Sequence, residues 1–512
     1  DAEKNIGAAE AEIFDAHLMM LDDPDFVEGM TNIVTDEKVC AEYACFVNCE
    51  NFQAMFRALD DEYMQARAAD IGDISQRVIK NLKGIADNAI DTITEPCIIV
   101  ANDLTPSDTA KIGGKPVAGF ITKIGGRTSH SAIMARSMGI PAVVGAGEKL
   151  DPIEDGMELL IDGAAGELIV QPDEETLVQF AEKKAKDDER RAMLAEFRDR
   201  PGETSDGRRI IIEGNIGTPG DAVRVMELGG EGVGLFRSEF LFMDRPDLPS
   251  EEEQFQAYKK AVETMDGRPV IIRTLDIGGD KEVPALDLEK EQNPFLGYRA
   301  IRICLNRTDL FLVQLRALLR AAQYGDLRIM FPMISSVDEL RNAKQVLREA
   351  SDLLDAEGVD YNPNVKVGIM VEIPVAAVCA DVLAQEADFF SIGTNDLIQY
   401  SCAVDRINEK ISYLYRPLHP GVLRLIAMTA KAANENGIEC GVCGEMAGTP
   451  GMASVLCGLG VTNLSMSASA MPAAKADLAA HSYAECRELA QRLLKTASAE
   501  DAENIFAEWR GE

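Results

Sequence analysis

Residues 125–136 place a histidine among glycines and hydroxyl-bearing residues in an order that could support phosphoryl chemistry. His130 is one of only four histidines in 512 residues. The apolar run 117–122 comes before it and predicts a strand, and a helix-forming segment follows. This layout predicts an imidazole at a helix N-terminus, where free backbone N–H groups and the helix dipole favour an anion. Two interpretations remain open: His130 accepts a phosphoryl group, or it only caps a helix.

A second set of polar side chains follows the apolar runs of the C-terminal part of the chain. Eight such runs begin near residues 209, 232, 270, 328, 366, 388, 439 and 462, and helical patterns separate most of them. This alternation predicts a (β/α)8 barrel, in which the carboxyl ends of all strands converge on one face. Most runs end in polar or charged residues, and we expect these to share an active site: Asn215, Arg237, Arg273, Asp276, Glu372, Asn395, Asp396, Cys443 and Glu445.

The arginines of this set suit a ligand that is rich in oxyanions. Arg237 and Arg273 end successive strands, and guanidinium groups bind carboxylate or phosphate in a bidentate manner. Arg299 and Arg406 lie in neighbouring loops and could add further positive charge. One such arginine alone would more often form a surface salt bridge, but several at strand ends favour an anion site.

Two carboxylates end neighbouring predicted strands. Glu372 ends the fifth strand, and Asp396 follows the sixth beside Asn395. Protein sites for Mg²⁺ usually offer one or two carboxylates and leave the other positions to water and substrate phosphate. The pair could equally serve to neutralise the arginines. Both interpretations describe an anion site.

Cys440 and Cys443 form a C-x-x-C pair, which invites a zinc or dithiol interpretation. A strand turns these two side chains to opposite faces, however, and no second pair or adjacent histidine completes a metal site. A single thiol that faces the mouth could instead donate a proton, because its ordinary pKa keeps it protonated near neutral pH. Cations, a divalent metal and a proton donor together match an enol phosphate that gives up its phosphoryl group.

Composition excludes several classes of protein. The net charge of −35 argues against non-specific binding to nucleic acid or to an anionic membrane. No stretch approaches the roughly 20 apolar residues that a membrane-spanning helix needs, so we expect no membrane insertion. Eleven scattered cysteines favour free thiols and a cytoplasmic location.

Apolar periodicity and local composition predict four regions. Residues 1–93 are helical, with a buried stripe at Ile71, Ile74, Val78 and Leu82, and form a helical bundle. An acidic junction at 60–62 could cap a helix or dock a partner. The remaining regions are a small α/β domain at 94–172, a charged helical linker at 173–205 and the barrel at 206–512.

The chain resembles enzyme I of the sugar phosphotransferase system, the phosphoenolpyruvate–protein phosphotransferases. The likeness covers essentially the whole chain and rests on long motifs in the order of the family: G-G-R-T-S-H-S-A-I-M-A-R, G-L-F-R-S-E-F-L-F-M-D-R, R-T-L-D-I-G-G-D-K, N-P-F-L-G-Y-R-A-I-R, D-F-F-S-I-G-T-N-D-L-I-Q-Y and C-G-E-M-A-G.

This resemblance implies a role for each candidate residue. His130 would be phosphorylated by phosphoenolpyruvate, and Cys443 would protonate the enolpyruvate. Glu372 and Asp396 would hold Mg²⁺. The substrate-binding residues would be Arg237, Arg273, Arg299, Asn395, Asp396 and Arg406.

The resemblance also implies partners. The helical region 1–93 would dock the phosphocarrier protein HPr, which accepts the phosphoryl group in the first step of sugar uptake. Family members are homodimers that associate through the barrel.

The family has a further N-terminal segment that this sequence lacks, and we expect an exposed sheet edge in the 94–172 domain and poor phosphoryl transfer as a result. A nitrogen-regulatory enzyme I with a different carrier has the same chemistry and stays open. A dikinase of the pyruvate phosphate class would need a nucleotide-binding domain, for which the sequence shows no glycine-rich loop. A regulatory scaffold is disfavoured because His130, Cys443 and both carboxylates are intact.

Overall fold

The computed structural model describes residues 21–511 apart from 22–23, 58–61, 84–89, 91, 105–107, 109–110, 113–114, 126–131, 133–134, 136–139, 244, 246, 279–282, 287, 290, 407 and 409. The chain divides into two compact units, Asp1–Ala185 and Lys186–Glu512. His130 lies outside the described residues, so its predicted helix N-terminus stays a prediction.

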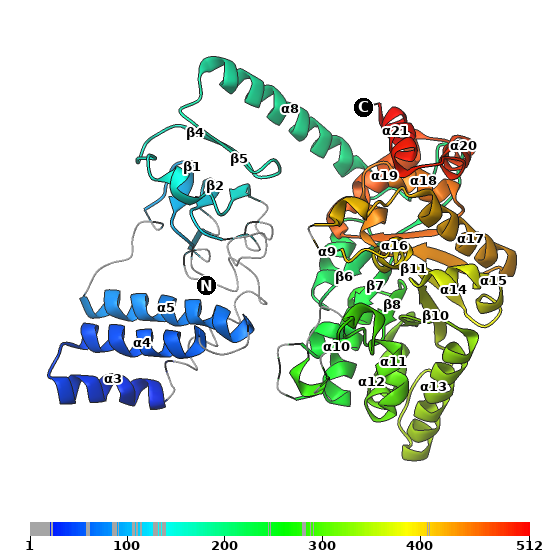
Figure 1. Ribbon diagram of the computed structural model, residues 1–512, viewed down its shortest axis with the longest axis horizontal. Helices are drawn as coiled ribbons and strands as arrows, with labels where there is room; N and C mark the ends of the chain where they lie inside the picture. The colour runs from blue at the N-terminus through cyan, green and yellow to red at the C-terminus, as the bar shows by residue number, and fades with distance from the viewer. Residues whose placement is uncertain are drawn as a thin grey trace. The chain divides into compact units, whose positions relative to one another are not determined.

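Three helices of the first unit lie side by side: α3 (Pro24–Glu37), α4 (Ala41–Arg57) and α5 (Glu62–Lys83) (Figure 1). Their apolar faces meet in a small core that contains Phe26, Ile71 and Ile74, each at most 2% exposed. The predicted stripe on α5 is wrong at Leu82, whose side chain is 47% exposed. Leu82 lies in the last turn of the helix, after Val78, which still packs against this core.

A small sheet follows these helices in the chain. Its parallel strands are β1 (Cys97–Ala101), β2 (Val117–Thr122) and β3 (Ala142–Val143), in that order, and β4 (Leu159–Asp162) pairs with β5 (Glu167–Val170) as an antiparallel hairpin. The predicted strand before the histidine is β2. Its last residue, Thr122, is buried, and its hydroxyl donates to the carbonyl of Ile124 at 2.8 Å. The strand therefore leads directly into the 125–136 segment.

The charged linker forms one long helix, α8 (Glu174–Phe197), which contains the boundary between the two units. Most of its side chains are exposed. Lys183 forms an ion pair with Asp162 of the hairpin. Just after the C-terminal end of α8, the buried ammonium of Lys475 donates to the carbonyls of Arg198 and Gly229, both at 2.7 Å. The N-terminal half of α8 is thus attached to the first unit, and the residue that follows the helix is attached to the second.

The second unit is a closed barrel of eight parallel strands in sequence order. Figure 1 shows several of these strands surrounded by helices. The strands match the eight predicted runs: β6 (Ile211–Ile216), β7 (Val233–Arg237), β8 (Val270–Arg273), β9 (Leu327–Phe331), β10 (Lys366–Val371), β11 (Phe389–Ile392), β12 (Glu439–Val442) and β13 (Asn463–Met466).

Helices follow the strands and cover the barrel. They are α9 (Asp221–Glu227), α10 (Glu251–Thr264), α11 (Ile301–Asn306), α12 (Thr308–Ala321), α13 (Val337–Glu357), α14 (Pro374–Val378), α15 (Ala380–Leu383), α16 (Thr394–Cys402), α17 (Pro420–Asn436), α18 (Met452–Gly458), α19 (Met471–Ala480), α20 (Tyr483–Leu494) and α21 (Ala499–Arg510). Capping boxes begin α10, α20 and α21, where a serine side chain and an acidic residue three positions later satisfy free N–H groups.

Two separate apolar cores hold the barrel together. The larger core lies between strands and helices and includes Cys440. The smaller one consists of strand residues and one residue that follows a strand: Leu235, Ile271, Met330, Met370, Phe389 and Cys443. Cys440 and Cys443 therefore lie in different cores, as the alternation of a strand requires.

The predicted fold class is confirmed: a helical bundle, a small α/β domain and a (β/α)8 barrel. Across the described part of the chain, no helix combines the length and the apolar character needed to cross a membrane.

Candidate active site

A cavity of about 490 Å³ lies at the carboxyl ends of the barrel strands. All of the barrel residues predicted to bind substrate or metal or to donate a proton line it: Arg237, Arg273, Arg299, Glu372, Asn395, Asp396, Arg406 and Cys443. They come from segments as far apart in the chain as Arg237 and Cys443, and the barrel topology brings them together.

Arg273 and Arg299 share one carboxylate. Asp276 Oδ2 lies 2.7 Å from Arg273 Nη1, and Asp276 Oδ1 lies 2.9 Å from Arg299 Nη2. Arg273 also pairs with Glu239, and Arg299 Nη2 lies 3.5 Å from Asp396 Oδ2. All five side chains are at most 10% exposed. Burial lowers the pKa of both arginines, but the nearby carboxylates have the larger effect, so the pKa of each arginine is raised.

Arg237 and Arg406 differ from that buried pair. Both line the cavity, and neither makes a salt bridge with any residue that the structure describes. The Arg406 backbone is held by the side chain of Gln399, whose Oε1 accepts from the Arg406 N–H at 3.1 Å. The mouth therefore has two fixed guanidinium groups and two that remain available for a ligand's oxyanions.

Glu372 and Asp396 fit a divalent cation. Burial raises the pKa of Glu372, and the nearby charges of Asp396 and Asp276 raise it further. Glu372 Oε1 accepts from the backbone N–H of Met333 at 2.6 Å. Asp396 Oδ1 is buried and accepts no hydrogen bond from the described residues. An orphaned oxygen beside a second carboxylate suits Mg²⁺, which needs few protein ligands.

Cys443 follows β12 and is only 2% exposed. Its Sγ lies 3.8 Å from the carbonyl oxygen of Ile392, and its own carbonyl accepts from Asn215 Nδ2 at 2.9 Å. Burial raises the pKa of the thiol to about 11, so it stays protonated at neutral pH. Asn215, a predicted member of the site, therefore acts by holding Cys443 and does not line the cavity.

Several residues around the cavity were not predicted from the sequence. Tyr400 accepts from Arg299 Nη1 at 3.1 Å and donates to the carbonyl of Phe295. Tyr400 lies one helical turn after Asp396, and that spacing could have indicated it. Met333 has a left-handed backbone (φ 55°), and its N–H reaches Glu372. No sequence signal identifies such a position, because a methionine rarely adopts that conformation.

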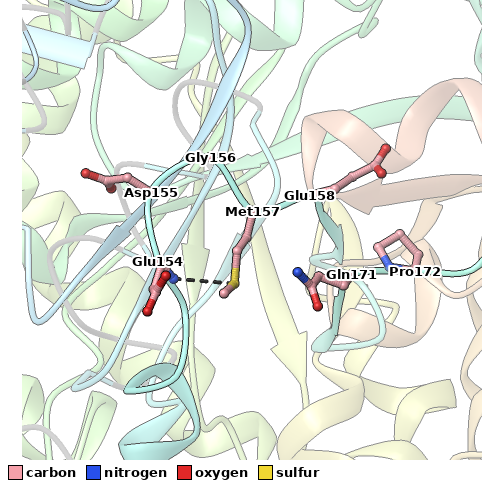
Figure 2. A pocket seen from close by; sticks show the side chains of 7 residues that line it. All are labelled: Glu154, Asp155, Gly156, Met157, Glu158, Gln171 and Pro172. Carbon is pink, nitrogen blue, oxygen red and sulfur yellow. Dashed lines mark hydrogen bonds between the residues drawn. The ribbon is translucent and has the colours of Figure 1, made fainter.

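A second hollow of about 470 Å³ lies in the first unit, beside the β4–β5 hairpin. Its lining is Glu154, Asp155, Gly156, Met157, Glu158, Gln171 and Pro172. Figure 2 shows that the three carboxylate side chains point in different directions. Its lining residues thus offer neither a cation nor converging metal ligands, and the barrel cavity is the stronger candidate for catalysis.

Three protein-family descriptions match the chain. Residues 191–483 match the phosphoenolpyruvate-binding domain of the phosphoenolpyruvate-utilising enzymes, residues 93–166 match their mobile domain, and residues 1–67 match their N-terminal domain.

Curated relatives resemble the chain over nearly its whole length. A phosphoenolpyruvate-protein phosphotransferase of Priestia megaterium is 50% identical over 98% of this chain and 87% of its own. The proteins of that name from Staphylococcus carnosus and Bacillus subtilis are 45% and 47% identical, over 99% and 97% of this chain and 89% and 87% of their own.

Asp276→Asn should destabilise the barrel, because it leaves two buried guanidinium groups without their shared counter-charge. We expect the free energy of unfolding to fall by about 3 kcal/mol, as is usual when one partner of a buried ion pair is removed. Denaturant unfolding monitored by fluorescence of the single tryptophan, Trp509, measures this effect.

Asp309→Asn is the matched control. Asp309 pairs with Arg307 through a carboxylate that is 68% exposed, so its loss should cost little. Equal effects of the two substitutions would show that the shared carboxylate does not stabilise the site.

Proposed function

Because the chain belongs to the phosphoenolpyruvate–protein phosphotransferase family and is therefore a phosphotransferase, we propose that its barrel cavity binds phosphoenolpyruvate and that His130 receives the phosphoryl group. One observation supports this assignment above all. The eight barrel residues that the sequence analysis predicts to bind or protonate an enol phosphate line a single cavity.

The two pairs of arginines have different tasks. Arg237 and Arg406 make no salt bridge within the described residues, so each can bind phosphate or carboxylate oxygens of the substrate. Arg273 and Arg299 are held by Asp276 and present a fixed positive charge to the cavity. Asn395 also lines the cavity and can donate from its side-chain amide.

Glu372 and Asp396 would hold Mg²⁺. The ion, when bound, would neutralise charge that develops on the phosphoryl and enolate oxygens. The chain's own contribution is to place two carboxylates together in a buried site, where Met333 orients one of them.

In the transfer step, the lone pair of a ring nitrogen of His130 attacks phosphorus. A nitrogen–phosphorus bond forms, and the bond between phosphorus and the enol oxygen breaks, with its electron pair left on oxygen. The resulting enolpyruvate then takes the Cys443 proton at C3, which yields pyruvate and a thiolate. Water returns the proton to the thiolate. Fixed positive charge around the enolate lowers the barrier to this sequence.

The helical residues of the first unit would present the carrier-docking surface. Tyr43 and Phe46 lie three residues apart on α4 and are 49% and 51% exposed. Large exposed apolar side chains on one helix face suit a protein partner. In the sugar phosphotransferase system this partner is HPr.

The barrel carries a surface for a second copy of the chain. Val375, Val378 and Val382 on α14 and α15 are each at least 44% exposed, at spacings of three and four residues. We assign this face to a homodimer, and sedimentation of the chain as a monomer at micromolar concentration would contradict that assignment.

All eleven cysteines are free thiols, which supports a cytoplasmic location.

The transfer itself is tested with phosphoenolpyruvate labelled in its phosphoryl group, Mg²⁺ and purified HPr. We expect acid-labile label on the native chain and on HPr, and none on either protein with His130→Ala. His481→Ala is the matched control, because that imidazole packs against Trp509 in the barrel. Equal labelling by the native and His130→Ala chains would refute the proposed function.

Cys443→Ser should slow the formation of pyruvate by roughly 10²- to 10⁴-fold, the usual contribution of a general acid. The reason is that serine is a far weaker acid than the thiol it replaces. Because the pKa of Cys443 is raised to about 11, the native thiol keeps its proton until the pH approaches that value, and the native rate should not fall between pH 7 and 9 through loss of this proton. Cys402→Ser, at a half-buried thiol outside the cavity, is the control. A Cys443→Ser enzyme that releases pyruvate at the native rate would exclude the thiol as donor.

Phe46→Asp should slow phosphoryl transfer to HPr and leave the labelling of the chain by phosphoenolpyruvate unchanged. Met55→Asp provides the control, since Met55 is equally exposed (53%) but lies on the opposite side of α4. Rapid-quench measurement separates the two transfers. Similar losses with both substitutions would argue against docking on the Tyr43–Phe46 face.

A further inference from the structure

Two aliphatic side chains lie in the mainly polar lining of the barrel cavity. Leu235 on β7 and Met370 on β10 both reach it, although they are only 3% and 2% exposed. Both belong to the same small interior core as Cys443. We call Leu235 and Met370 the apolar floor of the cavity, because most of the other lining residues are charged or polar.

The position of Met370 is closely fixed. Its sulfur accepts from Arg273 Nη1 at 3.7 Å, so a substrate-facing arginine and the floor touch each other. On the adjoining side, a Cβ added at Gly393 would lie 3.0 Å from Met370 Cγ and 2.9 Å from Glu372 Oε2. These contacts leave Met370 little room to move away from a bulky ligand.

The substrate has one apolar end that matches this floor. Phosphate and carboxylate belong beside the arginines, while C3 is a methylene group that must approach the thiol to be protonated. We propose that Leu235 and Met370 form a subsite for C3. This subsite would set the largest substituent that the enzyme accepts on that carbon, and the proposal rests on the function proposed above. An unsubstituted methylene fits against the floor, and a 3-alkyl group collides with it.

This subsite makes the enzyme selective among enol phosphates. One additional methylene group in a well-packed apolar pocket commonly changes kcat/KM by about 10- to 200-fold. We expect native enzyme to use phosphoenolpyruvate in preference to both isomers of 2-phosphonooxybut-2-enoate, which carry one methyl group on C3, by at least about tenfold.

Leu235→Ala removes part of the floor and should reduce this preference by about tenfold or more for at least one isomer. The measurement is kcat/KM for labelling of His130 with each substrate, with 2-oxobutanoate as the second product of the methylated ones. Met370→Ala is the second variant, and it should relax the preference in the same direction if Leu235→Ala fails to fold.

Ile271→Ala is the matched control. Ile271 belongs to the same interior core and loses a similar volume, but it does not line the cavity. It should keep the native ratio between substrates. The inference is overturned if native enzyme uses methylated and unmethylated substrates equally, if both floor variants keep the native ratio, or if Ile271→Ala changes that ratio as much as Leu235→Ala does. Native enzyme that takes no label from phosphoenolpyruvate would instead refute the proposed function.

Discussion

The carboxylate of Asp276 is the group on which the geometry of the barrel mouth depends. It holds Arg273 and Arg299 at the same time, and all three side chains are nearly inaccessible to water. Burying an isolated charged guanidinium group costs much free energy, and the shared carboxylate offsets this cost for both arginines. With these two arginines fixed, Asp396 and Tyr400 also acquire defined positions beside Arg299, and Met370 acquires one beside Arg273.

Around this fixed centre the cavity separates several chemical tasks by position. Arg237 and Arg406 line the cavity without a salt bridge to any described residue, Glu372 and Asp396 offer carboxylate oxygens, and Cys443 keeps its proton because it is buried. Each task requires a different environment, and a barrel can supply them from separate strand ends without changing its core. In the proposed function, the apolar floor would add a preference for a small carbon end next to Cys443, the proposed proton donor.

The sequence was most informative where periodicity and long motifs agreed. All eight barrel strands were predicted, and so was the convergence of their polar ends. Prediction was weaker where contacts between distant segments decide exposure. Leu82 has the spacing of a buried stripe but lies past the core that its helix helps to form. Asn215 ends a strand like the cavity residues but instead holds Cys443. His130 and its helix N-terminus rest on sequence alone, because they lie outside the described residues.

By itself, the sequence determined the fold class, the family and the residue types available for catalysis, since these follow from local periodicity and from motifs along the chain. Only the tertiary structure decided which arginines pair with carboxylates and which make no salt bridge within the described residues. It also decided that Met333 and Tyr400 contact Glu372 and Arg299, and that Leu235 and Met370 line the same cavity as Cys443. The reason is physical: the charge state and packing of a side chain depend on neighbours that are one hundred or more residues away, as Arg299 and Tyr400 are, and on the low dielectric that burial creates.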